Sequence, residues 1–276
     1  MARRWADHGF AVTAWNRDRR KAEALVAGTG SGAGAGDLTV ADSPAAAVAE
    51  AEVVVTMLAD GDATEAVMAD ALPALPAGAT WIQMGTVGLA ATDRLAALAS
   101  AAQVGIVDAP VSGTRQPAEQ GLLTVFASGP EALRDRCDRV FEPVAARVLW
   151  VGDDAGAGSR LKLVVNHWLA ALVAGLAESI ALAEGLGVDP RRFLAAIEGG
   201  PLGSGYATVK GAMMVDRQYP TAFPLHLLAK DVTLVAEAAA AAEVPLRLPS
   251  AISDLLAAAL PAHAEDDMSA AVEALR

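Results

Sequence analysis

The chain has 276 residues, of which 54% are hydrophobic and 20% are charged, so it can form two domains with hydrophobic cores. The formal net charge of −12 and the scattered basic residues argue against nucleic acid as a partner. The single cysteine, Cys137, excludes an intramolecular disulfide, and the four histidines lack metal-ligand spacing. We therefore expect no metal site and a cytoplasmic location.

Two segments have some character of a targeting or membrane sequence. The start of the chain has paired arginines, but Asp7 and His8 interrupt any apolar region that could follow them. Residues Trp168–Ala177 form the longest uncharged apolar stretch, and a membrane span needs about 20 such residues. We expect neither a leader nor a membrane span.

The first half of the chain alternates between two kinds of segment. Short β-rich runs predict strands at Phe10–Trp15, Glu52–Leu58, Thr80–Met84, Gly105–Ala109, Leu123–Ala127 and Arg147–Val151. Segments of helical composition separate them at Arg19–Ala27, Pro44–Ala49, Ala63–Ala71, Leu89–Ala101 and Pro130–Val144. Such alternation predicts an α/β domain with a mainly parallel sheet covered by helices on both faces.

The second half has helical periodicity only. Apolar residues recur at helical spacing through Gly158–Leu186, and the pattern continues in Pro190–Glu198, Phe223–Ala242 and Pro249–Ala259. We place the boundary near residues 152–158. The sequence predicts a doubly wound Rossmann-like domain of residues 1–154, followed by an all-α domain of residues 155–276.

The sequence lacks the expected start of a doubly wound domain. In such a domain the first strand leads into a Gly-rich turn that approaches a pyrophosphate. Here Met1–Gly9 has the pattern of a helix that leads into the predicted strand at Phe10, so the first strand and its loop would lie upstream. Residues Gly30–Ala35 satisfy a loose G-x-G-x-x-[GA] pattern but follow a helix, which indicates a surface loop.

The end of the strand Phe10–Trp15 carries the remaining cofactor signal. An acidic residue at this position would bind the ribose hydroxyl of NAD, whereas an arginine accommodates the 2′-phosphate of NADP. Arg17 therefore favours NADPH. The alternative is that Arg17–Lys21 is the solvated start of a helix, and the spacing alone does not decide between the two.

Lys162 and Asn166 stand four residues apart in a segment that is apolar almost all round, which indicates a buried helix. Lysine is rarely buried without a partner. Either the Lys162 side chain extends to solvent along the apolar surface, or it lines a cleft between the domains where cofactor and substrate meet.

Asp108–Gly113 follows a predicted strand, and open α/β sheets bind ligands at strand ends. Ser112 offers a hydroxyl, and Gly113 allows the backbone to approach an anion. By themselves these residues form an ordinary turn, and Lys230 with Asp231 forms an ordinary surface charge pair.

Together these segments resemble the β-hydroxyacid dehydrogenase family, which includes 3-hydroxyisobutyrate dehydrogenases and glyoxylate/succinic semialdehyde reductases. The similarity covers essentially the whole chain. The segments that carry it are Met1–Arg17, Val54–Leu58, Gly85–Val87, Asp108–Gly113, Gly156–Asn166 and Phe223–Asp231.

The resemblance implies roles for individual residues. Lys162 would be the catalytic acid/base and Asn166 would position it and the substrate. Residues implied to bind the substrate carboxylate or the substrate are Ser112, Gly113, Thr114, Asn166 and Lys230. Residues implied to border the cofactor are Asn16, Arg17, Lys21, Met57, Leu58, Thr86 and Lys230.

Within the family, Ser112–Gly121 is most similar to the S-G-[ST]-K-K-P-A-E-x-G segment of glyoxylate/succinic semialdehyde reductases. The Asn16-Arg17 pair and Lys21 are similar to the NADPH-binding segment of the same subgroup, although Asp18 departs from it. The resemblance thus implies NADPH-dependent reduction of a small carboxylate-bearing aldehyde or 2-oxo acid, with Lys162 as proton donor. NADH is the alternative cofactor.

Three other functions remain open from the sequence. The chain could be an NAD-dependent 3-hydroxyisobutyrate-type dehydrogenase, an imine reductase of similar architecture, or a truncated protein that binds no cofactor and catalyses nothing. The resemblance also implies a homodimer or homotetramer, because helical second domains of this family build such assemblies.

Overall fold

The computed structural model describes residues 1–26 and 36–276. The chain divides into two compact units, Met1–Lys162 and Leu163–Arg276, and each is described by itself. The Gly-rich stretch Gly30–Ala35 lies outside the described residues. The division falls inside a helix rather than before it, because the first turns of that helix bind to the strands of the first unit.

The first unit alternates strands and helices along the chain, as the sequence predicts. Its strands are β1 Val12–Ala14, β2 Leu38–Val40, β3 Val53–Thr56, β4 Thr80–Gln83, β5 Gly105–Asp108, β6 Val111–Ser112, β7 Leu123–Ala127 and β8 Ala145–Trp150. Its helices are α1 Ala2–Asp7, α2 Arg19–Val26, α3 Pro44–Val48, α4 Gly61–Ala71, α5 Leu89–Ala101, α6 Arg115–Gln120 and α7 Arg134–Phe141, with 3-10 turns at Leu72–Ala74 and Glu131–Leu133.

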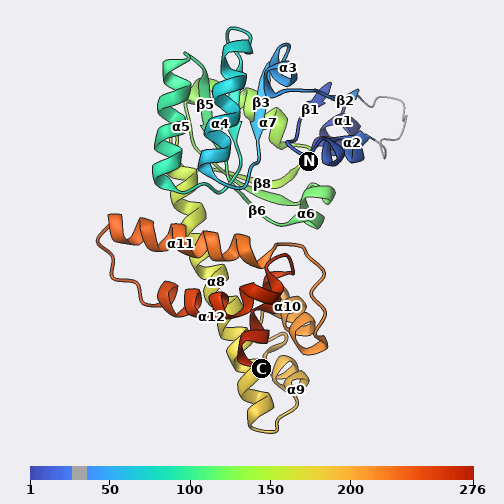
Figure 1. Ribbon diagram of the computed structural model, residues 1–276, viewed down its shortest axis with the longest axis vertical. Helices are drawn as coiled ribbons and strands as arrows, with labels where there is room; N and C mark the ends of the chain where they lie inside the picture. The colour runs from blue at the N-terminus through green and yellow to red at the C-terminus, as the bar shows by residue number, and fades with distance from the viewer. Residues whose placement is uncertain (27–35) are drawn as a thin grey trace. The chain divides into compact units, whose positions relative to one another are not determined.

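The strands β3, β4 and β5 form a parallel sheet with helices on both faces. Trp81 of β4 packs with helices α3, α4 and α5 on one face. The next residue, Ile82, packs with α1 and α7 on the other. Figure 1 shows α4 and α5 together on one side of these strands. Successive side chains of a strand point to opposite faces, so both faces of this sheet are apolar.

The parallel sheet is interrupted between β1 and β3. Strands β1 and β2 pair with each other, and within the part of the chain that the structure describes no ladder joins β1 to β3. In a doubly wound sheet with the strand order 3-2-1-4-5-6, the first strand lies between the second and the fourth. The gap between β1 and β3 is at the corresponding place. The topology therefore agrees with the predicted Rossmann-like domain that lacks its first strand.

A third sheet extends the first unit beyond β5. Strand β6 pairs antiparallel with β7, and β7 pairs parallel with β8. A single antiparallel bridge between Asp108 and Ser128 links this sheet to the end of β5. The bridge brings the ends of β5 and β7 together.

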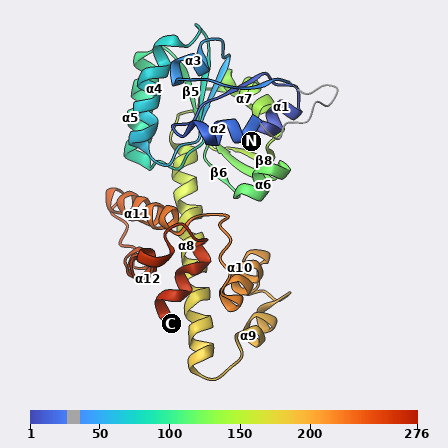
Figure 2. The same ribbon diagram turned by 45° about the vertical axis from the view of Figure 1, so that its right-hand side comes forward.

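The second unit is helical throughout its described length. Its helices are α8 Ala157–Gly185, which begins in the first unit, α9 Pro190–Ile197, α10 Gly205–Asp216, α11 Leu225–Ala241 and α12 Leu248–His263, followed by the 3-10 helix η3 Met268–Leu275. One core cluster joins α8, α10, α11, α12 and η3 through Ile180, Met214, Leu228, Leu256 and Met268, one from each element. Helices α9 and α10 lie side by side (Figure 2).

Helix α8 has the length and apolar composition of a membrane span, and it is the one such helix among the described residues. The mean hydropathy of its most apolar window is 1.5, and 44% of that window is buried inside the protein. A helix that runs through a folded core meets the same criterion, so this observation is weak support for a span. The expected absence of a membrane span stays a prediction.

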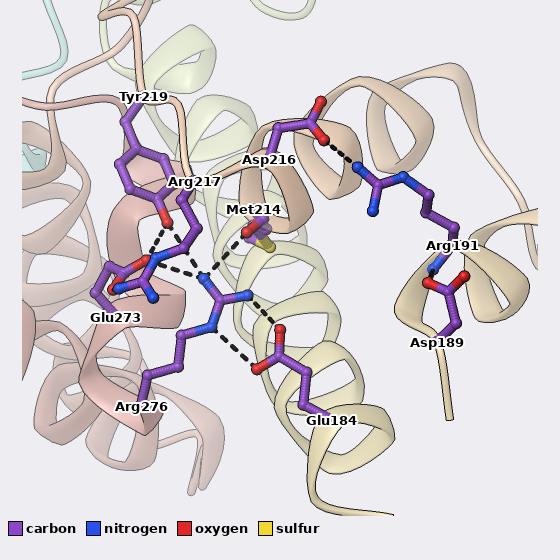
Figure 3. Close-up of polar contacts among 9 residues, drawn as sticks. All are labelled: Glu184, Asp189, Arg191, Met214, Asp216, Arg217, Tyr219, Glu273 and Arg276. Atoms are coloured by element: carbon purple, nitrogen blue, oxygen red, sulfur yellow. Dashed lines mark hydrogen bonds and ion pairs between the residues drawn. The ribbon is translucent and has the colours of Figure 1, made fainter. Parts of the chain in front are cut away.

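The C-terminal residue ties three elements of the second unit together (Figure 3). The Arg276 guanidinium binds Glu184 of α8, donates to the Met214 carbonyl of α10 at 3.1 Å and contacts Glu273 of η3 at 2.9 Å. Tyr219 also donates to Glu273. Because the Arg276 side chain is largely buried, this network holds the end of the chain against the helical core.

Candidate active site

Buried hydrogen-bond networks and four strand ends, those of β1, β3, β4 and β5, position the predicted site residues. Asn16 and Arg17 follow β1, Met57 and Leu58 follow β3, and Thr86 follows β4. Asp108 ends β5 and leads into Ser112 of β6. All of these strands belong to parallel ladders except β6, and the carboxyl ends of parallel strands are where such sheets bind ligands.

The end of β1 presents basic side chains. Arg17 and Lys21 are exposed, and Asn16 accepts a hydrogen bond from the Asp18 backbone N–H at 2.9 Å. The Asp18 carboxylate, which would repel a 2′-phosphate, pairs with Arg20 at 3.2 Å, and this hydrogen bond holds its pKa below the usual range. The local charge therefore suits the phosphate end of NADP, and these residues fit that cofactor.

The ends of β3 and β4 are joined by a buried amide. Gln83 accepts from the Thr56 hydroxyl at 3.0 Å and from the Gly85 N–H at 3.1 Å, and donates to the Gly85 carbonyl at 2.8 Å. A side chain at Gly85 would lie 2.8 Å from the Leu58 carbonyl oxygen, so the close approach requires glycine. The backbone of Leu58 is thereby brought close to Gly85, the residue before Thr86. Sequence analysis missed Gln83 because one buried amide in a strand has no periodic signal.

The segment Ser112–Thr114, which the resemblance implies to bind the substrate, forms a short strand and the start of a helix rather than a simple turn. Ser112 pairs with Thr124 of β7, and Gly113 has φ +119, a conformation that favours glycine. Thr114 precedes α6, which sequence analysis did not predict. Ser112 and Thr114 are half-buried and Gly113 is exposed.

Lys162 lies in the second turn of α8 and its residue is only 9% exposed. The first turn of the same helix is bound to the end of β5. Asp108 accepts from the backbone N–H of Ser159 at 2.8 Å and of Gly156 at 3.1 Å, and from the Ser159 hydroxyl at 2.8 Å. The strand end that leads into Ser112 therefore also holds the helix that carries Lys162.

Burial raises the pKa of Asp108 to about 6, and the hydrogen bonds from Ser159 and Gly156 oppose that rise. Sequence analysis assigned no role to Asp108 or Ser159. Neither residue has a local pattern that reveals a contact across 51 residues of sequence.

In the second unit, α8 and α11 bring two other predicted residues together. Asn166 donates to Asp231 at 2.7 Å, and the Lys230 ammonium lies 3.0 Å from the other Asp231 oxygen. The Asn166 side-chain oxygen is buried and has no hydrogen-bond partner among the residues that the structure describes. A buried acceptor of this kind is suited to a ligand that donates a hydrogen bond. Asp231, which the sequence presents only as half of a charge pair, therefore contacts two of the predicted site residues.

Both parts of the chain match known protein families. Residues 1–152 match the NAD-binding domain of 6-phosphogluconate dehydrogenase, and residues 156–275 match the NAD-binding domain of NADP-dependent 3-hydroxyisobutyrate dehydrogenase. The chain belongs to the β-hydroxyacid dehydrogenase family. It is an NAD(P)-dependent oxidoreductase of that type.

Individual relatives are similar over most of the chain. Glyoxylate/succinic semialdehyde reductase 2 of Arabidopsis thaliana is 28% identical over 100% of this chain and 76% of its own length. A probable 3-hydroxyisobutyrate dehydrogenase of Mycobacterium tuberculosis is 32% identical over 81% of this chain and 78% of its own. The structure of the M. tuberculosis 3-hydroxyisobutyrate dehydrogenase with L-serine has a TM-score of 0.86 and 28% identity, covering 100% of this chain and 94% of that one.

We expect Asp108 to lower the free energy of unfolding as the pH rises. Its pKa is 3.8 in a free chain and about 6 in the folded protein, so the folded state binds the proton more tightly. This contribution is complete below about pH 4 and is lost as the pH passes 6, by about 3 kcal/mol in total. Urea unfolding between pH 4 and 8 measures it as the difference between the wild type and Asp108→Asn.

Asp93→Asn, at an exposed position of α5, is the matched control. A difference between the wild type and Asp108→Asn that stays constant across this pH range would contradict the prediction.

Proposed function

We propose that the protein reduces a small carboxylate-bearing aldehyde or 2-oxo acid, of the glyoxylate or succinic semialdehyde type, with NADPH. The observation that carries the proposal is the burial of Lys162 in a helix whose first turn is held by the strand end that leads into Ser112. A substrate carboxylate at Ser112 and a proton donor at Lys162 are then supplied by neighbouring parts of one unit. The name of the Arabidopsis relative supports this substrate class.

NADPH, when bound, supplies the hydride that reduces the carbonyl carbon. Asn16, Arg17 and Lys21 would hold its 2′-phosphate, and Met57, Leu58 and Thr86 would border it. The Ser112 hydroxyl and the Gly113 N–H would bind the substrate carboxylate, with Thr114 beside them. Hydrogen bonds from hydroxyl and backbone N–H groups to a carboxylate fix its orientation.

Lys162 would transfer a proton from its Nζ to the oxygen of the developing alkoxide. A lysine is ordinarily charged at neutral pH, so it can act as the acid in this direction. Its positive charge would also stabilise the oxyanion before the proton moves. The Asn166 side-chain oxygen would accept a hydrogen bond from the hydroxyl of the alcohol product, and Lys230 would approach the substrate and the nicotinamide.

One observation favours a second candidate function, an NAD-dependent 3-hydroxyisobutyrate-type dehydrogenase. One M. tuberculosis relative is named a probable 3-hydroxyisobutyrate dehydrogenase, and a similar structure of M. tuberculosis 3-hydroxyisobutyrate dehydrogenase contains L-serine, which is a 3-hydroxy carboxylate. The ratio of kcat/KM for glyoxylate with NADPH to kcat/KM for 3-hydroxyisobutyrate with NAD separates the two candidates.

We expect Lys162→Ala to reduce kcat by about 10³-fold and to leave the Kd for NADPH unchanged, because Lys162 acts on the substrate oxygen. Lys162→Arg should remain strongly impaired, since a guanidinium keeps the charge but does not release its proton. Steady-state kinetics and fluorescence titration with NADPH measure both effects. Near-normal turnover of Lys162→Ala would refute the proposed role.

We expect the protein to bind NADPH more tightly than NADH and Arg17→Ala to reduce this preference by about 10-fold, which corresponds to one lost phosphate contact. Arg192→Ala, exposed on α9, is the control and should bind both cofactors like the wild type. If the chain binds neither cofactor, the non-catalytic alternative is favoured. Recovery of binding when upstream residues are added would then trace the defect to the interruption between β1 and β3.

We further propose that the second unit forms a homodimer or homotetramer through one face of α8. Large apolar side chains are exposed there: Val164 (67%), Trp168 (69%) and Leu182 (62%), with Leu186 (71%) directly after the helix. Val164 and Leu182 are separated by five helical turns, so they lie on the same face. A second copy would bury this apolar surface.

Leu182→Glu should shift the protein toward monomer in sedimentation velocity, because it places a charge in the proposed interface. Leu202→Glu is the matched control, since Leu202 is exposed but lies outside α8. A wild-type protein that sediments as a monomer at micromolar concentration would contradict this proposal.

A further inference from the structure

Helix α8 has no capping side chain at its own start. The residue before it is Gly156, which has φ +107 and no side chain that could accept a hydrogen bond. Helix starts usually obtain such an oxygen from a neighbouring Ser, Thr, Asp or Asn. Here the oxygen comes from Asp108, which is 48 residues away from Gly156 in the sequence.

The Asp108 carboxylate binds the start of α8 through both of its oxygens. Oδ2 accepts from the backbone N–H groups of Gly156 and Ser159, and Oδ1 accepts from the Ser159 hydroxyl. Asp108 is fully buried and Ser159 is 4% exposed. Hydrogen bonds to a buried charged group are strong and directional, so the first turn of α8 is held in one orientation.

A second strand end fixes the same turn from another side. The Ser128 hydroxyl accepts from the Gly158 N–H at 2.9 Å, and the backbones of Asp108 and Ser128 bond reciprocally at 2.9 and 2.8 Å. A side chain at Gly158 would lie 2.2 Å from the Phe126 carbonyl oxygen, so the helix backbone packs directly on β7. These contacts define both the position of the helix end and its rotation about its axis.

Lys162 follows Ser159 by three residues and lies on the same face of the helix, about 4.5 Å further along the axis. Its direction is therefore set by the rotation that Asp108 and Ser128 impose. Building on the proposed function, we infer that Asp108, acting through Ser159, is a positioning residue that aims Lys162 at the substrate oxygen. Asp108 itself needs no contact with substrate or cofactor for this role.

Ser159→Ala tests the inference, because it removes one hydrogen bond to Asp108 and leaves the backbone N–H in place. We expect kcat to fall by about 100-fold with an unchanged KM for NADPH, as small misplacements of a catalytic group have that effect. Ser159→Thr, which keeps the hydroxyl, should restore most of kcat. Ser204→Ala, which removes the cap hydroxyl of α10, is the matched control and should keep wild-type kcat.

A second measurement requires no cofactor. The ¹³Cε resonance of Lys162, assigned by its loss in Lys162→Arg, should shift in Ser159→Ala and in Asp108→Asn but not in Ser204→Ala. The double variant of Asp108 and Ser159 should lose no more kcat than the stronger single variant, because the two residues act as one unit.

The outcomes separate this inference from the proposed function. An active Lys162→Ala variant would overturn the proposed function and the positioning role with it. An inactive Lys162→Ala variant together with a Ser159→Ala variant that keeps kcat would overturn the positioning role alone. The same conclusion would follow if the loss of kcat in Ser159→Ala only matched its unfolded fraction and the Lys162 resonance stayed in place.

Discussion

The hydrogen bonds of the buried Asp108 carboxylate are the contacts on which the first unit's candidate site depends. They join the end of β5 to the first turn of α8, and they do so where the helix has no cap of its own. Burying a carboxylate is costly, and its raised pKa reflects that cost. The protein offsets it with three hydrogen bonds to the charged form, which also hold the helix start in place.

Because of these hydrogen bonds, the positions of the proposed site residues depend on the strands of the sheet. Ser112 lies four residues after Asp108 and is held by β7, and Ser128 at the end of β7 binds the same helix turn. A change in the register of β5 or β7 would therefore move both the proposed carboxylate-binding segment and Lys162. In the second unit, Asp231 has a comparable function, because it joins Asn166 of α8 to Lys230 of α11.

The residues proposed to bind the cofactor are held by contacts other than those of Asp108. Gln83 holds the ends of β3 and β4 together, and Met57, Leu58 and Thr86, which are proposed to border the cofactor, follow these two strands. The basic residues Arg17 and Lys21 follow β1, which pairs with β2 in a separate two-stranded sheet. Within the first unit, Ser112 and Lys162 are thus held by the ends of β5 and β7, whereas the residues proposed for phosphate binding follow a strand of another sheet.

The amino-acid sequence by itself determined the α/β fold of the first unit, the all-α fold of the second, most of the helices and strands, and the family. Strands such as Leu123–Ala127 and helices such as Leu89–Ala101 were predicted at their observed bounds, because local apolar periodicity is sufficient for them. Strands β2 and β6 have only three and two residues, too few for an alternating pattern, and α10 was missed because glycines occupy its sequence.

The tertiary structure alone decided which polar residues meet. The contacts of Asp108 with Ser159 and of Asn166 with Asp231 join residues 51 and 65 positions apart. Local patterns report the propensity of a segment and the face that it buries, but they do not specify which buried donor finds which acceptor. That pairing depends on strand register and helix rotation, and these are set by the packing of the whole unit.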